Sequence, residues 1–341
     1  MKKSLITGCA AVLLLLSCNN DKKMPDALAD YTHSMDDKRF HFGDKLMLPK
    51  EVTDRAESIS ISFGDRETSD LTIDPKFFEF GDNEVTFNIK TKGGETLNQD
   101  VNIRIFTKNP EQNIAYVIVA EYPRDPRNFV EGFLLEGNTV YESTGMKGES
   151  RLETYALGST TPALSEKQAP EIFSEGCTIV GDKMYQLTYQ NKTGFVYDKN
   201  TFKKISEFPL PDEFAEGWGL TYDGKYLIAD TGSNDLYFSD AGNPSKVMKK
   251  LPVGGNKDVY DQINELEYYN GFIYANVWHQ PFIVKINPAN GEVTGRFDFT
   301  EITEENTRNN SEHVLNGIAF KGDHMLVTGK NWPKIYEVAI K

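Results

Sequence analysis

A short motif, Phe-x-Glu-Gly, occurs three times in this 341-residue chain and constrains its fold more than any other feature. The copies read FVEG, FSEG and FAEG and begin at Phe129, Phe173 and Phe214, so they lie 44 and 41 residues apart. Two later segments, INELE from Ile263 and VLNGI from Val314, share the same surroundings: an apolar stretch, a turn and a second apolar stretch. Such a repeat predicts an architecture in which each copy is one supersecondary unit.

A third apolar segment follows each of the five copies. These segments are residues 151–157, 194–198, 235–239, 282–287 and 334–338. A unit of several short strands that recurs every ~40–50 residues is typical of a propeller blade. The repeat therefore predicts an all-β chain with a five-bladed β-propeller over residues 114–341. A β-solenoid is the alternative that repetition alone leaves open.

The two ends of the repeat region predict how the ring closes. The fifth copy ends at Lys341 after three strands, so it lacks an outer strand. Residues 114–122, IAYVIVAEY, form a strong strand pattern before the first copy and have no unit of their own. We therefore expect residues 114–122 to pair with residues 334–338, which would hide sheet edges that otherwise invite pairing with other chains.

The third residue of each copy is the first candidate for a functional position. These residues are Glu131, Glu175, Glu216, Glu265 and Asn316. If the first strand of each blade lines the central channel, four carboxyl groups and one amide face a common space. The glycine that follows the glutamate in three copies would let backbones approach closely, because it has no Cβ. Solvated channel lining is the alternative reading of this pattern.

The segment before the repeat predicts a second, smaller domain. Apolar residues alternate with polar ones around residues 59–63, 85–89 and 101–105, and Gly93-Gly94 lies between the last two as a hairpin signal. About seven short strands in some 70 residues indicate a small immunoglobulin-like β-sandwich over residues 37–108. No chemical motif is found in it, so we interpret it as a spacer, with the boundary near Asn109-Pro110.

The amino-terminal residues indicate export and a lipid anchor. Lys2 and Lys3 precede an apolar run, residues 5–16, that is too short to span a bilayer. The following Leu-Leu-Ser-Cys, residues 15–18, resembles a bacterial lipobox, which implies a signal peptide over 1–17, cleavage before Cys18 and lipidation of its thiol. Residues 18–36 would be a tether. The expected location is the bacterial cell envelope, on the periplasmic or surface side of the outer membrane; an ordinary secretory signal is the alternative.

Composition excludes several function classes. The net charge of −14 disfavours a nucleic-acid binder, which would need a basic face. With Cys9 removed and Cys18 lipidated, only Cys177 remains, so the mature chain forms no intramolecular disulfide, and we interpret Cys177 as a buried structural thiol. The five histidines lack metal-ligand spacing, so we expect no metal and no cofactor.

Several longer motifs resemble one enzyme family. They are YPRDPRNFVEGF, VYESTG, YQLTYQNKTGFVYD, EGWGLTYDG, NELEYYNGFIYANVW, VLNGIAF and VTGKNWP. In order and spacing they are similar to the plant and bacterial glutaminyl cyclases, or glutamine cyclotransferases, over about residues 115–341. The resemblance implies a five-bladed propeller that converts the amino-terminal glutamine of peptides or proteins to pyroglutamate and releases ammonia. It does not extend to residues 19–110.

The resemblance also implies roles for individual residues. The family's acidic catalyst matches Glu175, its asparagine matches Asn264 and its lysine matches Lys330. Two aromatic residues of the family's substrate pocket match Trp218 and Trp278, and indole N–H groups can donate to an oxygen while the rings exclude water. Substrate contacts are also expected from Phe129, Glu131 and Tyr189.

Two of these positions depart from the family pattern. Glu131 stands where the family has glutamine, and Tyr189 stands where it has tryptophan. An ionised Glu131 would only accept hydrogen bonds and would add negative charge beside Glu175. It could raise the pKa of Glu175 or attract a substrate ammonium group.

Two other functions remain open at this point. Glu131, Glu175, Asn264 and Asn316 could hold calcium through oxygen ligands, as in a lactonase-type hydrolase. The second open function is that of a non-catalytic binding module that kept the propeller scaffold. Unchanged activity after exhaustive chelation would exclude the first, and turnover of a glutamine-initiated peptide would exclude the second.

Overall fold

The computed structural model describes residues 23–307 and 310–341. The predicted signal peptide and the lipid-bearing Cys18 lie outside these residues. The chain divides into two compact units. Of the described residues, the first contains 23–38, Gly43–Phe77 and Asn83–Ile103, and the second contains Arg39–Phe42, Phe78–Asp82 and residues 104–341 apart from the gap at 308–309. None of the helices in the described residues is long and apolar enough to cross a membrane.

The segment before the propeller contains one mixed sheet and two helices. Its elements are α1 (Lys23–His33), β1 (Arg39–Phe40), α2 (Lys50–Thr53), β2 (Ala56–Phe63), β3 (Arg66–Thr68), β4 (Gly81–Thr91) and β5 (Thr96–Ile105). The strand order is β1-β5-β4-β2-β3, with β1 parallel to β5. Within the described residues this segment has a single sheet, so it lacks the two packed sheets of the immunoglobulin-like sandwich that we predicted.

Helix α1 also corrects the prediction that residues 18–36 are only a tether. Met24 and Leu28 lie four residues apart, on one face of the helix, and pack with Val52 and Ile89 in a buried cluster. The polar residues between them hid this apolar face in the sequence. The predicted second sheet is thus replaced by a helix that covers the apolar residues of the one sheet.

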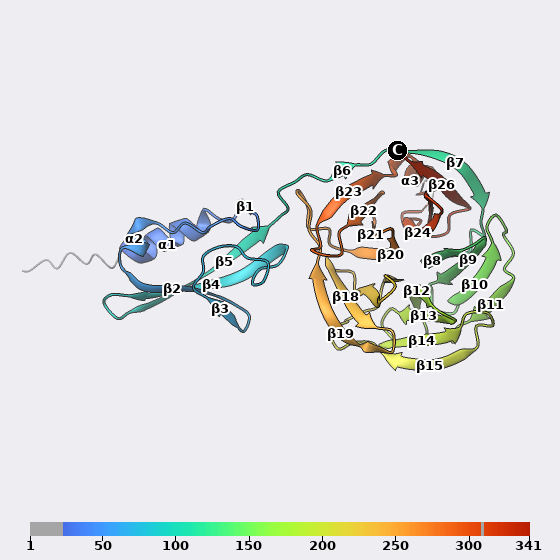
Figure 1. Ribbon diagram of the computed structural model, residues 1–341, viewed down its shortest axis with the longest axis horizontal. Coiled ribbons are helices and arrows are strands. Elements are labelled where there is room, and N and C mark those ends of the chain that lie inside the picture. Colours follow the sequence, from blue (N-terminus) through green and yellow to red (C-terminus); the bar gives the residue numbers. More distant parts are fainter. Residues whose placement is uncertain (1–22, 308–309) are drawn as a thin grey trace, which may run out of the picture. The chain divides into compact units, whose positions relative to one another are not determined.

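The second unit is a five-bladed β-propeller, as predicted (Figure 1). In each blade the first three strands lie side by side in sequence order, from the centre of the ring outward. Neighbouring strands among them are antiparallel. The strands of the first three blades are β8 (Val130–Glu136), β9 (Thr139–Thr144), β10 (Arg151–Ala156) and β11 (Leu164–Lys167); β12 (Ser174–Val180), β13 (Lys183–Thr188), β14 (Thr193–Asp198) and β15 (Lys204–Pro209); and β16 (Leu220–Tyr222), β17 (Tyr226–Asp230), β18 (Asp235–Asp240) and β19 (Asn243–Pro252).

The fourth and fifth blades each take a strand from the segment that precedes the first blade. The fourth consists of β20 (Ile263–Tyr269), β21 (Phe272–Val277), β22 (Phe282–Ile286) and β23 (Val293–Asp298), with β6 (Gln112–Asn113) added at its edge. The fifth consists of β24 (Leu315–Lys321), β25 (His324–Gly329), β26 (Lys334–Ile340) and β7 (Tyr116–Pro123). Helix α3 (Thr300–Thr307) lies between these two blades in the sequence.

The pairing of β7 with β26 closes the ring as predicted. The two strands are antiparallel, with Lys334 opposite Pro123 and Ile340 opposite Tyr116. Just beyond β7, the fully buried Arg124 forms an ion pair with Glu142 of the first blade and donates to the carbonyl oxygens of Gly329 and Trp332 in the fifth. One side chain therefore joins the first and last blades at the seam.

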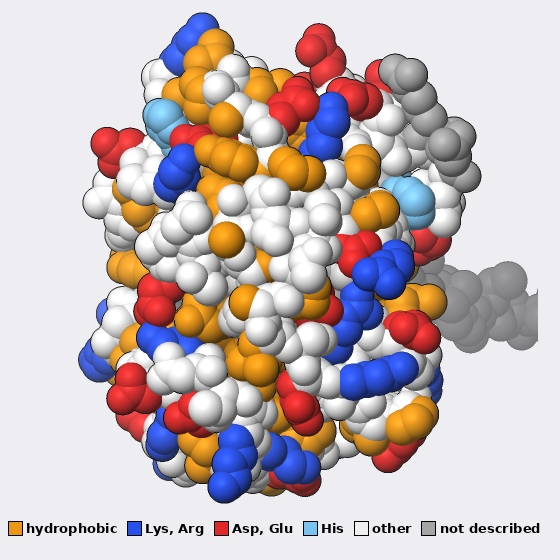
Figure 2. Space-filling view, turned by 90° about the vertical axis from the view of Figure 1, so that its right-hand side faces the viewer, with side chains coloured by type: hydrophobic (Ala, Val, Ile, Leu, Met, Phe, Trp, Pro, Cys, Tyr) orange, Lys and Arg blue, Asp and Glu red, His pale blue; other side chains and the backbone are white. Residues whose placement is uncertain are grey.

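The core of the propeller lies between blades, in five apolar clusters, one at each blade–blade interface. At the seam, for example, Val130 and Phe133 of the first blade pack with Ala319, Leu326 and Ile335 of the fifth. Burying a side chain of this size contributes about 1.5–3 kcal/mol, so the interfaces account for much of the stability of the ring. On the face shown in Figure 2, acidic and basic groups are interspersed at the surface.

Candidate active site

The innermost strands share one irregularity, which positions the site. In β8, β12, β20 and β24 the pairing register shifts near the start of the strand, as a β-bulge. The pair of Leu220 with Ala229 in the third blade corresponds, in the other blades, to the pairs Phe133–Glu142, Cys177–Gln186, Leu266–Ala275 and Ile318–Val327. Two positions before these pairs, the five blades carry Glu131, Glu175, Trp218, Asn264 and Asn316.

This register corrects the ring of acids that we predicted. Glu131, Glu175 and Asn316 hold equivalent positions, but the equivalent residues in the third and fourth blades are Trp218 and Asn264. Glu216 lies two residues before its predicted place, and Glu265 one residue after it. The discrepancy arises because the motif does not keep one place relative to the strand pairing: the glutamate of FAEG lies four residues before the Leu220–Ala229 pair, whereas that of FSEG lies two residues before the Cys177–Gln186 pair.

The next position along the innermost strands explains the glycines of the motif. In the first, second, third and fifth blades this position is a glycine: Gly132, Gly176, Gly219 and Gly317. In the fourth blade it is Glu265. A Cβ on Gly132 would lie 2.5 Å from the backbone nitrogen of Cys177. The side chain of Glu265 bridges two other blades, because its carboxyl oxygens accept from the N–H groups of Phe133 (3.2 Å) and Ile318 (2.8 Å). Glu265 therefore belongs to the structural centre of the ring and not to the pocket.

A second ring of positions lies just after the second strand of each blade. It contains Gly145, Tyr189, Gly232, Trp278 and Lys330. The same backbone hydrogen bond holds four of them: for example, the N–H of Tyr189 donates to the carbonyl of Phe173 at 3.0 Å, and that of Lys330 to the carbonyl of Val314 at 2.9 Å. The two glycines leave room for aromatic rings, since a Cβ on Gly232 would lie 2.7 Å from the indole of Trp218.

The two rings of residues enclose a pocket of about 270 Å³. It is lined by all eight residues that we predicted for the site, together with three others: Phe129, Glu131, Met146, Phe173, Glu175, Tyr189, Trp218, Asn264, Trp278, Glu312 and Lys330. All five blades contribute, and so does the loop before β24, so the pocket exists only in the closed propeller.

Aromatic rings form a continuous wall on one side of the pocket. Neighbouring centroids are 6.3 Å apart for Phe129 and Phe173, 5.6 Å for Phe173 and Tyr189, 6.5 Å for Tyr189 and Trp218, and 5.8 Å for Trp218 and Trp278. The Nζ atom of Lys330 lies 4.7 Å from the ring centroid of Phe129, where the face of the ring attracts a cation. The wall suits a short, partly apolar side chain with a polar end.

Glu131 and Lys330 form a buried ion pair beneath this wall. Nζ of Lys330 lies 2.8 Å from Oε1 of Glu131, and the amide of Asn316 donates to Oε2 of Glu131 at 3.2 Å. Burial raises the pKa of Glu131, and the charge of Lys330 opposes that shift. Glu131 stands where the family has glutamine, and its carboxylate therefore lies against the ammonium group of Lys330.

Glu175 has the environment of a proton-transfer group. Its side chain is buried, and burial raises its pKa well above the usual range; the charge of Glu131 adds to this rise, and that of Lys330 opposes it. Among the described residues no hydrogen-bond donor reaches its carboxyl oxygens. The backbone carbonyl of Glu175 accepts from Oγ of Ser143 at 2.5 Å, which fixes the main chain beneath the carboxyl group.

Asn264, Trp218 and Trp278 each bring a polar group to the pocket, and these groups differ in whether a protein atom already binds them. Oδ1 of Asn264 is buried and has no partner in the described part of the chain, so it can accept from a ligand. The indole N–H of Trp218 donates to Oε2 of Glu216 at 3.1 Å, so it is not directed at a ligand, contrary to our expectation. For Trp278 no protein acceptor is found among residues 23–307 and 310–341.

The sequence interpretation missed three lining residues. Phe173 occupies the same blade position as Phe129, so the first residue of the repeated motif already indicated it. Met146 and Glu312 are exposed loop residues at the pocket, and neither has a motif that marks it. Sequence alone gave no signal for these two.

Further acidic groups are buried away from the pocket. Asp230 accepts from the backbone N–H groups of Gly219 and Gly232, both at 3.1 Å, and burial raises its pKa well above the usual range. Burial likewise raises the pKa of Glu267 to about 8 and that of the buried thiol of Cys177. Within the described residues, no cluster of three or more histidine, cysteine or acidic side chains is arranged to hold a metal ion.

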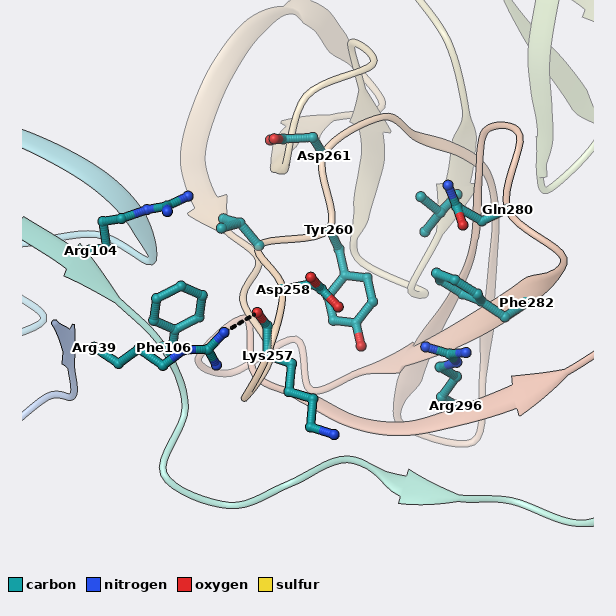
Figure 3. Close-up of a pocket in the computed structure, with 12 residues that line it drawn as sticks. Arg39, Arg104, Phe106, Lys257, Asp258, Tyr260, Asp261, Gln280, Phe282 and Arg296 are labelled. Carbon is teal, nitrogen blue, oxygen red and sulfur yellow. Dashed lines mark hydrogen bonds between the residues drawn. The ribbon is translucent and has the colours of Figure 1, made fainter. Parts of the chain in front are cut away.

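A larger cavity of about 660 Å³ lies elsewhere on the second unit (Figure 3). Its basic groups contact the chain itself: the guanidinium of Arg39 donates to the carbonyl of Lys257 at 3.0 Å and lies 4.5 Å from the ring centroid of Phe106. Arg296 lies 4.0 Å from the ring centroid of Phe282. The bond from Arg39 stabilises the loop at residues 256–261, and the two acids that line the cavity, Asp258 and Asp261, are exposed, unlike Glu175.

Fold and site together define a five-bladed propeller with a buried carboxyl group and a buried lysine in an aromatic pocket. The chain belongs to the glutamine cyclotransferase family, whose model matches residues 93–340. It is 36% identical over 229 residues to the glutaminyl-peptide cyclotransferase of Arabidopsis thaliana, which covers 66% of this chain and 71% of that protein. The crystal structure of Myxococcus xanthus glutaminyl cyclase superposes with a TM-score of 0.61 at 30% identity, covering 68% of this chain and 99% of that chain.

Proposed function

We propose that this chain is a glutaminyl-peptide cyclotransferase, which converts the amino-terminal glutamine of peptides or proteins to pyroglutamate and releases ammonia. The observation that carries the proposal is Glu175, a buried carboxyl group with a raised pKa and free oxygens in an aromatic pocket. Membership of the family and the relatives named above support the same reaction.

In the proposed reaction the neutral α-amine attacks the δ-amide carbon of the same glutamine. A nitrogen–carbon bond forms, the bond to the amide nitrogen breaks, and ammonia leaves. The attacking nitrogen must lose a proton and the leaving nitrogen must gain one, so a single carboxyl group between them can carry it. Glu175 is the candidate, because its raised pKa makes it a stronger base than an ordinary carboxylate and lets it both take up and return a proton.

Lys330 and Asn264 are the candidates for stabilising the charge that develops on the amide oxygen. Preorganised donors in a water-poor site stabilise such an oxyanion strongly. Lys330 directs one of its three N–H groups to Glu131 and keeps the others for a ligand. The unpartnered Oδ1 of Asn264 can accept from an N–H group of the substrate, and the aromatic wall can exclude water.

Incubation with a glutamine-initiated peptide, followed by mass spectrometry for the loss of one ammonia, tests the function. We expect turnover by the native chain and a loss of about 10²-fold or more in Glu175→Gln, in line with general acid–base contributions. Glu171→Gln, on an exposed residue of the preceding loop, is the matched control and should keep full activity. Normal turnover in Glu175→Gln would overturn the assignment of the proton carrier.

The same assay separates the two other functions. A calcium-dependent hydrolase would need several free oxygens around one ion, whereas both carboxyl oxygens of Glu131 already have partners. We therefore expect exhaustive chelation to leave cyclisation unchanged. A binding module without activity would retain peptide affinity but release no ammonia.

We further propose that the mature chain is anchored in the bacterial cell envelope by lipid on Cys18, on the periplasmic or surface side of the outer membrane. The support is the sequence pattern of residues 1–18. Metabolic labelling with a fatty acid tests it: label should enter the native chain and be absent from Cys18→Ala, which should also leave the membrane fraction. Equal labelling of both would contradict the anchor.

A further inference from the structure

Glu216 stands where two other blades place an aromatic ring. It lies four positions before the pair of Leu220 with Ala229, as Phe129 and Phe173 lie four positions before the corresponding pairs in their blades. In the first two blades this position contributes a ring to the pocket wall. In the third blade it contributes a partly exposed carboxylate instead.

The carboxylate of Glu216 binds the outer ends of the neighbouring wall residues. The indole N–H of Trp218 donates to Oε2 at 3.1 Å, and the amide of Gln190 donates to Oε1 at 2.8 Å. Burial raises the pKa of Tyr189, and the nearby carboxylate of Glu216 adds to that rise. One side chain therefore acts on two adjacent rings of the wall, whose centroids lie 6.5 Å apart at an interplanar angle of 55°.

The contacts of Glu216 are with neutral donors only. In the described residues no lysine or arginine lies within ion-pair distance of it, whereas Glu131 is paired with Lys330. The charged and titratable groups around it are Tyr189 on the neighbouring loop, Glu175 behind the wall and Lys192, which donates to the carbonyl of Phe214. Nothing in this arrangement uses Glu216 to neutralise a charge, so its role is to bind the donors of the wall.

We propose that Glu216 is a positioning residue that fixes Tyr189 and Trp218 and thereby sets the affinity of the pocket for the amino-terminal side chain of the substrate. The proposal rests on the proposed function. It gives the departure at Tyr189 a physical basis: a phenol hydroxyl can donate to Glu216 and keep its ring in the wall. Because Glu216 touches the wall and not the reacting atoms, its loss should act on KM and leave kcat nearly unchanged.

The test compares Glu216→Leu, Tyr189→Phe and the double variant with the native enzyme. We expect Glu216→Leu to raise KM for a glutamine-initiated peptide about tenfold, since hydrogen bonds to a charged acceptor are lost, with kcat within about threefold. Glu216→Gln keeps one acceptor oxygen and should restore most of the affinity. Tyr189→Phe should add little in the Glu216→Leu background, because the shared bond is already absent. Glu213→Leu, an exposed glutamate three residues earlier, should leave both constants unchanged.

A second measurement needs no turnover, so it separates this proposal from the proposed function. The chain has three tryptophans, and Trp332 is fully buried, so acrylamide quenching reports on Trp218 and Trp278. Quenching should increase in Glu216→Leu and stay at the native level in Glu213→Leu. An unchanged KM, an unchanged quenching constant, or strictly additive effects of the two substitutions would each overturn the proposal. Absence of cyclisation in the native chain would instead refute the proposed function.

Discussion

The Nζ atom of Lys330 lies 2.8 Å from Oε1 of Glu131, and the two side chains are only 7% and 2% exposed. The residues are 199 positions apart in the sequence and belong to the last and the first blade. Their ion pair therefore lies at the seam where the ring closes and at the floor of the pocket at once. A substitution here acts on both stability and the electrostatics of Glu175.

Lys330→Met should strongly destabilise the propeller. It leaves the carboxylate of Glu131 buried without its counter-charge, which typically costs about 3–5 kcal/mol when one partner of a buried pair is removed. The free energy of unfolding, measured with urea, should fall by that amount. The double variant Lys330→Met/Glu131→Gln should recover most of the loss, because no buried charge remains. Equal stability of the single and double variants would contradict this account.

Glu131→Gln should shift the pH dependence of cyclisation. In the native chain the charge of Glu131 raises the pKa of Glu175, and that of Lys330 lowers it. The substitution removes the first effect and leaves Lys330 without a counter-charge, so both changes lower the pKa of Glu175. Glu175 then loses its proton at lower pH, and the acid limb of kcat/KM should move to lower pH. Glu213→Gln is the control and should leave the pH profile unchanged. If the acid limb of Glu131→Gln lay at the same pH as that of the native enzyme, the charge of Glu131 would not affect Glu175.

The repeat predicted the propeller and its closure because both depend on patterns that survive in the sequence. Five copies with turns and apolar strands predict five blades, and a surplus strand at residues 114–122 predicts the partner of β26. The eight predicted site residues line one pocket, because the family motifs that contain them lie at equivalent blade ends. What failed was the register within the innermost strands.

Register depends on strand pairing, which the repeated motif does not show. The position equivalent to Glu175 in the fourth blade carries Asn264, so matching glutamate to glutamate placed Glu265 one position too early in its blade. In the first unit, α1 was hidden because only Met24 and Leu28 of its residues join the buried apolar cluster. Tertiary packing decided both cases.

Gly176→Ala should disrupt the packing of the second blade against the third. A Cβ at this position would lie 2.5 Å from the nitrogen of Leu220 and 2.6 Å from the carbonyl oxygen of Trp218, and backbone atoms cannot move aside easily. We expect a loss at the upper end of the usual ~0.5–3 kcal/mol range in urea unfolding. Gly93→Ala is the matched control, since the nearest atom to its added Cβ is 3.6 Å away, and it should be nearly neutral.

Arg124→Leu should open the seam between the first and last blades. The fully buried guanidinium pairs with Glu142 and binds carbonyl oxygens of Asn128, Gly329 and Trp332, so its loss leaves a buried carboxylate without its counter-charge and removes three hydrogen bonds. Removing one partner of such a pair costs about 3–5 kcal/mol. Urea unfolding should show that loss, and hydrogen exchange should rise first in β7 and β26, the strands that close the ring.

The control for this prediction is Arg127→Leu, three residues further along the chain. Its side chain is 81% exposed and pairs with Asp125 at the surface, where an ion pair contributes only about 0–1 kcal/mol. If Arg124→Leu unfolded no more easily than Arg127→Leu, the buried pair would not hold the seam, and the pairing of β7 with β26 would have to close the ring alone. Faster exchange spread evenly over all five blades would contradict a local opening at the seam.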